Sequence, residues 1–192
     1  ELAMNVVNAA ARISNFLGAQ LLGGASAGSW RDGFEIIAGL MGQYVAGLVS
    51  TPSLGGGSRN LIDLREGRGA YCMTTLASLH AAYHGLSPFA TPSDRLRVVM
   101  SLSRLHLHVI ARPAVRARRF RDLRRYRVSP GLVGFSTFNL FQELLKLSGI
   151  TEADFQQAGG DVVHFDYPEA KRQFEAGNID VLIWLTGVPN AL

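Results

Sequence analysis

Short apolar runs that alternate with amphipathic segments are the feature that most restricts how this chain can fold. Apolar runs lie at 20–24, 48–52, 69–73, 126–129, 161–165 and 179–185. Segments with the apolar spacing of helices follow at 30–45, 59–66, 75–83, 138–148 and 169–176. Ser58 is a good N-cap for the helix over 59–66, and Thr74 or Thr75 is the N-cap of the helix that ends at 83. Because strands that alternate with helices form parallel sheets covered by helices on both faces, this order predicts an α/β fold.

Two further segments predict how the chain is divided. Residues 3–17 space their apolar side chains three and four apart, which predicts an N-terminal helix that ends at Gly18. Residues 96–110 alternate apolar and polar side chains, as a long strand or a bent pair of strands does. We therefore expect a first lobe over 1–112, including the N-terminal helix, and a second lobe over 113–192.

The positive charge of the chain is concentrated in one segment. The chain has a net charge of +4, yet eight arginines and a single acid, Asp122, lie between Arg112 and Arg127. A basic cluster can neutralise phosphates, but this one contains no motif that reads nucleic acid. We expect a solvated, arginine-rich face and no nucleic-acid partner.

Residues that could carry chemistry are few. Cys72 is the only cysteine, which excludes an intrachain disulfide and a cysteine-based zinc site. His80 and His84 have metal-ligand spacing on a predicted helix, but no acid is placed to complete the set. Ser136 lacks the sequence of a nucleophile elbow. We expect no catalytic residue, no metal and no cofactor.

Three loops of small residues share one position, between a predicted strand and the helix that follows it. They cover 25–29, 55–58 and 134–137. Glycine lets backbone N–H groups approach a ligand closely, and a helix N-terminus offers unpaired donors with a partial positive charge. In open α/β sheets, ligands bind beyond the carboxyl ends of the strands. The three loops therefore predict the binding of a carboxylate or another anion.

These loops and several other short motifs occur in an order that resembles a known family. The segments are Ala25–Ser29, Leu54–Ser58 with Asn60-Leu61, Gly67–Gly85, Phe120–Leu123, Gly134–Thr137, Gly177–Asp180 and Gly187–Pro189. In order and spacing, across 20–190, they are similar to TAXI-type solute receptors of tripartite ATP-independent periplasmic (TRAP) transporters. The resemblance implies a periplasmic-binding-protein type II-like architecture of two α/β lobes with parallel sheets flanked by helices.

The resemblance also implies a function. It implies an extracytoplasmic, periplasmic protein, its leader removed or outside this sequence, that captures a small carboxylate such as glutamate between its lobes. Its partners would be the solute and the membrane subunits of a TRAP transporter. The expected ligand-binding residues are Ser26, Gly28, Ser29, Trp30, Arg31, Gly57, Ser58, Thr74 and Thr75 in the first lobe and Gly134, Ser136, Thr137 and Pro189 in the second.

This chain departs from the family pattern in two respects. The first loop of the family has an aromatic pair after two glycines, whereas this chain has Gly28-Ser29-Trp30-Arg31, so we expect Trp30 or Arg31 to take over that contact. In the family, the last part of the chain returns from the second lobe to the first, and the sequence up to Leu192 contains no such segment. We therefore expect a fragment or a shortened homologue that is incomplete at the C-terminus. The alternative function is the ligand-binding effector domain of a transcriptional regulator.

Overall fold

The computed structural model describes residues 20–24, 29–44, 48–51 and 56–188. The chain divides into two compact units; one contains β1 and residues 30–96, and the other contains residues 97–192. The predicted helix over 3–17 lies outside the described residues. Among the residues described, no helix is both long and apolar enough to cross a membrane.

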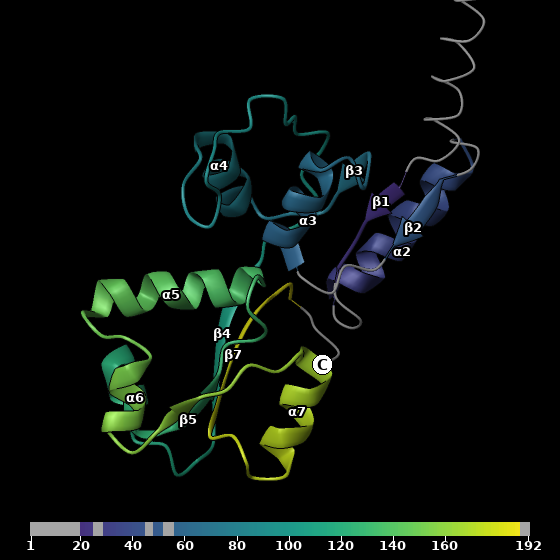
Figure 1. Ribbon diagram of the computed structural model, residues 1–192. Helices are drawn as coiled ribbons and strands as arrows, with labels where there is room; N and C mark the ends of the chain where they lie inside the picture. The colour runs from purple at the N-terminus through teal and green to yellow at the C-terminus, as the bar shows by residue number, and fades with distance from the viewer. Residues whose placement is uncertain (1–19, 25–28, 45–47, 52–55, 189–192) are drawn as a thin grey trace, which may run out of the picture. The chain divides into compact units, whose positions relative to one another are not determined.

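The first unit is built from three strand-helix pairs (Figure 1). Its elements are β1 (Gln20–Leu22), α2 (Ser29–Gly42), β2 (Val49–Thr51), α3 (Gly56–Arg65), β3 (Tyr71–Cys72) and α4 (Leu76–His84). The strands are parallel in the order β2-β1-β3, with Leu21 level with Ser50 and Tyr71. Parallel neighbours bring the carboxyl ends of the strands to one edge of the sheet, where α3 and α4 begin.

The ends of α4 follow from its flanking residues. Thr75 is the N-cap, and its hydroxyl accepts a hydrogen bond from Ser78 N at 3.1 Å. The helix ends at Gly85, whose φ of 67° is in the left-handed region that favours glycine. Leu61, Ala82 and Phe89 form the buried core between α3 and α4. The structure confirms the predicted helix and selects Thr75 over Thr74 as its N-cap.

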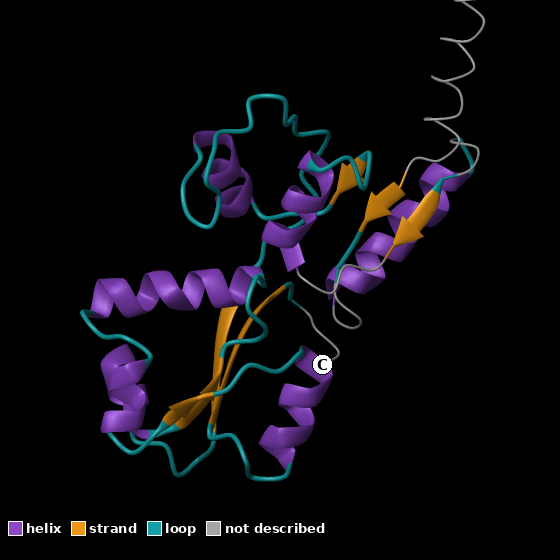
Figure 2. Cartoon of the chain, in the orientation of Figure 1, coloured by secondary structure: helices purple, strands orange, loops and turns teal. Residues whose placement is uncertain are grey.

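The second unit is a four-stranded sheet covered on both faces (Figure 2). Its elements are β4 (His106–Ala111), the 3₁₀ helix η1 (Phe120–Arg125), β5 (Arg127–Ser129), α5 (Ser136–Ser148), α6 (Ala153–Gln157), β6 (Asp161–Val162), α7 (Tyr167–Glu175) and β7 (Val181–Thr186). The strand order is β4-β7-β5-β6; β5, β6 and β7 run parallel, and β4 pairs with β7 antiparallel over six residues. The sheet is therefore mixed, not purely parallel.

The strand β7 separates two apolar cores. Val181 and Ile183 pack with residues of η1, α5 and α6, whereas Leu182 and Trp184 pack with residues around α7. Successive side chains of a strand point to opposite faces, so α5 and α6 cover one face and α7 covers the other (Figure 1).

Several elements differ from the sequence expectation. The alternating pattern predicts a long strand or a bent pair of strands over 96–110, but β4 begins only at His106. Residues 96–105 are mostly exposed and take part in none of the strand pairings among the described residues. The structure assigns β4 to the second unit through its pairing with β7, so the main division falls between 96 and 97 and not at 112. The short helices η1 and α6 are not predicted by the periodicity, which needs more than five or six residues to be visible.

Candidate functional site

The carboxyl ends of two strands in the first unit are joined by one side chain. Asn60, fully buried in α3, donates from Nδ2 to the carbonyl oxygens of Gly23 at 2.8 Å and Met73 at 2.7 Å. Gly23 follows β1 and Met73 follows β3. Asn60 therefore fixes the positions of two strand ends relative to the start of α3.

The described hydroxyl groups that were expected to bind ligand in the first unit, those of Ser58, Thr74 and Thr75, form hydrogen bonds within the fold. Ser58 Oγ and Thr75 Oγ1 donate to Ser78 Oγ at 3.1 and 3.0 Å, and Thr74 Oγ1 donates to the carbonyl oxygen of Gly57 at 3.1 Å. Ser58 lies in the first turn of α3 and is buried, so it is not the N-cap that its sequence position predicts. These bonds join the N-termini of α3 and α4.

The other predicted residues of the first unit are only partly described. Trp30 is half-buried in the first turn of α2, and Arg31 forms an ion pair with Glu35 one turn further along. Ser26, Gly28 and Pro189, as well as the side chain of Ser29, lie outside the described residues. Their roles as ligand contacts stay predictions.

In the second unit, the turn between β5 and α5 positions the predicted residues. Gly131 and Gly134 have φ angles of 86° and 93°, a conformation that glycine adopts without strain. The turn delivers Thr137, fully buried, into the first part of α5. Thr137 Oγ1 lies 2.7 Å from the hydroxyl oxygen of Tyr167 and accepts a hydrogen bond from Leu185 N at 3.2 Å. Thr137 thus ties the start of α5 to both α7 and β7.

Three polar side-chain atoms of β5, α5 and β7 are buried without a hydrogen-bond partner. They are Ser129 Oγ, Ser136 Oγ and Trp184 Nε1. Ser129 is level with Leu182 in the parallel β5–β7 pair, and Trp184 lies two residues further along β7. Level residues and residues two apart share a face, so Ser129 and Trp184 lie on the same face of the sheet, with Trp184 beyond the end of β5.

Three aromatic rings pack in series next to Thr137. The ring centroids of Phe135 and Tyr167 are 5.4 Å apart, and those of Tyr167 and Trp184 are 5.6 Å apart. Burial raises the pKa of the Tyr167 phenol, so the hydroxyl stays protonated at neutral pH. We define the strand-end site as Ser129, Ser136, Thr137, Tyr167 and Trp184, which come from β5, β7 and the first turns of α5 and α7.

A histidine holds the turn in front of α5. His164 Nδ1 lies 3.2 Å from the carbonyl oxygen of Gly131, and its Nε2 lies 3.4 Å from a carboxylate oxygen of Glu152. Its ring also meets that of Phe138, with the centroids 5.3 Å apart. Because both ring nitrogens of His164 face acceptors, the residue holds the turn in place.

The chemistry of the strand-end site follows from its donors. The indole N–H of Trp184 can only donate, and serine hydroxyls can donate as well. The N-terminus of α5 adds backbone donors and a partial positive charge, and the N-cap Phe135 has no side chain that could satisfy them. The arrangement is therefore suited to an acceptor group of a ligand, above all an oxyanion.

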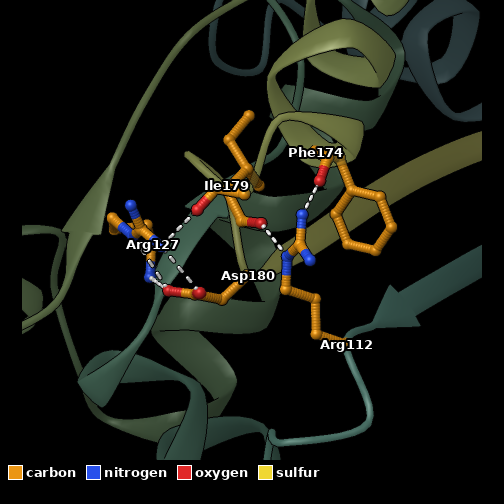
Figure 3. Close-up of polar contacts among 6 residues, drawn as sticks. Arg112, Arg127, Phe174, Ile179 and Asp180 are labelled. Atoms are coloured by element: carbon orange, nitrogen blue, oxygen red, sulfur yellow. Dashed lines mark hydrogen bonds and ion pairs between the residues drawn. The ribbon is translucent and has the colours of Figure 1, made fainter.

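Two arginines of the basic segment have structural roles at the opposite end of the sheet (Figure 3). Arg127 forms a bidentate pair with Asp180, with Nη2–Oδ1 at 2.9 Å and Nε–Oδ2 at 3.1 Å. Arg112 donates to the carbonyl oxygens of Ile179, at 3.0 Å, and Phe174, with its guanidinium 5.0 Å from the Phe174 ring centroid. Both fix the turn between α7 and β7.

His80 and His84 are the pair for which the sequence offers metal-ligand spacing. The ring centroids of His80 and His84 lie 4.5 Å apart on α4. Within the described ranges, no group of three or more His, Cys, Asp or Glu side chains could hold a metal ion.

The sequence reasoning missed Ser129, Tyr167 and Trp184 at this site and the role of Asn60. A signal was present for Ser129 and Trp184, because each is a polar or amphipathic residue inside a run that is otherwise apolar. The contact of Tyr167 with Thr137 joins residues 30 apart, and no local pattern predicts it.

The fold is of the periplasmic-binding-protein type II-like class, α/β with mostly parallel strands flanked by helices. The model of the NMT1-like family matches residues 36–192, and the chain belongs to this family. Among solved structures, the chain is similar to the alkanesulfonate-binding protein SsuA from Xanthomonas axonopodis pv. citri bound to MOPS, at 17% identity and a TM-score of 0.52. The match covers 89% of this chain and 55% of that one, so the chain spans about half the length of the relative. No curated protein matches the sequence.

Proposed function

We propose that this protein is an extracytoplasmic solute-binding protein whose strand-end site binds the oxyanion of a small organic acid. The observation that carries the proposal is a set of three buried polar groups without partners, on Ser129 at the end of β5, Ser136 at the start of α5 and Trp184 in β7. A buried donor without a partner costs about 1–3 kcal/mol. A ligand oxyanion would remove this cost by accepting these hydrogen bonds.

The proposed solute is a carboxylate, as the resemblance to TAXI-type receptors implies. The solved relative is an alkanesulfonate-binding protein, and a sulfonate presents the same kind of acceptor oxygens to neutral donors. Among the residues that define the strand-end site, none is a cation, so hydrogen-bond donors and the helix N-terminus would supply the recognition. We propose no catalytic role for these residues.

The partners and location belong to the same proposal. We propose a periplasmic protein that delivers its solute to the membrane subunits of a TRAP-type transporter. The order of the motifs in the sequence supports this assignment, and the observed α/β fold agrees with the fold that the resemblance to these receptors implies.

Isothermal titration calorimetry with amino acids, dicarboxylic acids and alkanesulfonates tests the proposal. We expect at least one compound to bind, and we expect Ser136→Ala to weaken its binding about tenfold or more, because a hydrogen bond to a charged group contributes about 1.5–3 kcal/mol. Ser101→Ala is the matched control, since Ser101 is exposed in the segment before β4. Failure of every compound to bind the folded protein, or equal affinities for both variants, would contradict the proposal.

A further inference from the structure

Six arginines of the second unit take no part in the structural contacts of Arg112 and Arg127 described above. They are Arg116, Arg118, Arg119, Arg121, Arg124 and Arg125, which we call the arginine surface. All are exposed except Arg124, which is half-buried. Within the part of the chain that the structure describes, the ion pairs include none of these six side chains.

The folding of this segment fixes which side chains face solvent. Leu123 is buried in the core of the second unit, and Val115, Phe120 and Tyr126 pack against that core. These apolar residues anchor η1 and the strand that follows it. The arginines between them are therefore presented on a structured surface and not on a flexible tail.

The nearest acids do not neutralise this charge through ion pairs. Asp122 accepts hydrogen bonds from the backbone N–H groups of Arg118 and Arg119, both at 2.9 Å, and these bonds lower its pKa. Asp154 accepts from the N–H and hydroxyl of Thr151 at 2.6 and 2.9 Å. Six arginines and one acid leave residues 116–125 with a net charge of +5. Like charges repel one another in the folded state, and a polyanionic partner would relieve the repulsion.

We propose that the arginine surface binds the anionic phospholipid surface of a membrane. Guanidinium groups bind phosphate oxygens in a bidentate manner, and a bilayer presents phosphates over a continuous plane. An apolar side chain lies beside the surface as well: Arg121 Nη2 contacts the carbonyl oxygen of Ser148 at 3.4 Å, and the preceding Leu147 is 83% exposed. An exposed leucine near basic residues can enter the headgroup region.

Nucleic acid fits this surface less well. Binding of single strands uses exposed aromatic rings on which bases stack, whereas Phe120 and Tyr126 pack against the core. The preference for a bilayer also rests on the extracytoplasmic function proposed above. Vesicle binding is measured without solute, so a failure of vesicle binding can be distinguished from a failure of solute binding.

Cosedimentation with vesicles of phosphatidylglycerol and phosphatidylcholine tests the proposal on the full chain at about 0.1 M salt. The surface variant replaces Arg118, Arg119, Arg121 and Arg125 by Gln. The control variant replaces Arg95, Arg104, Lys171 and Arg172 by Gln, so it loses the same charge at other positions. Each basic residue near an anionic bilayer strengthens binding about fivefold, so we expect the surface variant to bind several hundredfold more weakly and the control to bind nearly as the parent does.

Three results would overturn the proposal. The parent chain does not bind anionic vesicles, or the two variants lose binding equally, or the parent binds double-stranded DNA at the same salt concentration at least as tightly as vesicles. Circular dichroism of both variants checks that they are folded. Leu147→Ser provides a second measurement, and we expect it to weaken vesicle binding severalfold while leaving the salt dependence unchanged.

Discussion

Replacing Thr137 by valine tests how the start of α5 is held against the sheet. Valine has nearly the same shape as threonine, so the substitution removes the hydroxyl without leaving a cavity. Thr137 is fully buried, and its hydroxyl bonds both Tyr167 OH and Leu185 N. The variant leaves two buried groups unpaired at about 1–3 kcal/mol each, so we expect a loss of about 2–5 kcal/mol in the free energy of unfolding.

Urea unfolding followed by tryptophan fluorescence measures this loss. The chain has two tryptophans, Trp30 and Trp184; a Trp30→Phe background leaves Trp184 as the reporter of the second unit. Tyr167→Phe is the matched control, since Thr137 can still accept from Leu185 N, and we expect a loss of about 1 kcal/mol. The double variant should lose less free energy of unfolding than the two single variants together. The reason is that it no longer contains the Tyr167 hydroxyl that Thr137→Val leaves unpaired.

A loss of less than about 0.5 kcal/mol in Thr137→Val would refute this reasoning, since surface substitutions have effects of that size. Thr137 was expected to contact ligand on the basis of the sequence. A stable Thr137→Val protein that fails to bind solute would favour that role over the structural one.

Three further predictions concern other parts of the chain. Ser58→Ala should lower the free energy of unfolding of the first unit by about 1 kcal/mol, because it breaks the buried bond to Ser78; an unchanged melting curve would contradict this. Burial raises the pKa of the Cys72 thiol to about 11, so iodoacetamide at pH 8 should alkylate the native protein more slowly than the urea-unfolded chain, and equal rates would exclude it. Hydrogen bonds from Arg127 lower the pKa of Asp180 in the folded protein. The Asp180 carboxylate therefore stabilises the fold fully at pH values above the unfolded pKa of about 3.9. This stabilisation is lost as the pH falls through the lower folded pKa. In Asp180→Asn, the free energy of unfolding should therefore fall less steeply with decreasing pH than in the parent protein. An equally steep fall in both proteins would contradict the pairing of Asp180 with Arg127.

The alternation of apolar runs and helical segments predicted most strands and helices, because each depends on periodicity within a few residues. The cap at Thr75 and the end of α4 at Gly85 are local signals of the same kind. The N-cap predicted at Ser58 is wrong because α3 begins two residues earlier, at Gly56, and Ser58 points into the contact with α4. Local spacing alone does not show which of several small residues begins a helix.

The site was less predictable than the fold. The sequence predicted Ser136 and Thr137 in a loop of small residues between β5 and α5, whereas both lie in the first turn of α5, which begins two residues before the predicted start at Phe138. The sequence did not distinguish them, because the bond from Leu185 N to Thr137 joins residues 48 apart. Trp184 was missed because a tryptophan inside an apolar strand is the same, in sequence, as a packed core residue. Its unpaired indole N–H is visible only in the structure.

The indole N–H of Trp184 offers the most direct test of the proposed strand-end site. In the Trp30→Phe background, a proton–nitrogen correlation spectrum contains a single indole signal, because the chain has only two tryptophans. If a bound oxyanion accepts from Trp184 Nε1, this signal shifts on titration with the solute found by calorimetry, and the shift follows the calorimetric saturation curve. An indole signal that stays unchanged while the solute saturates the protein would show that the oxyanion binds elsewhere.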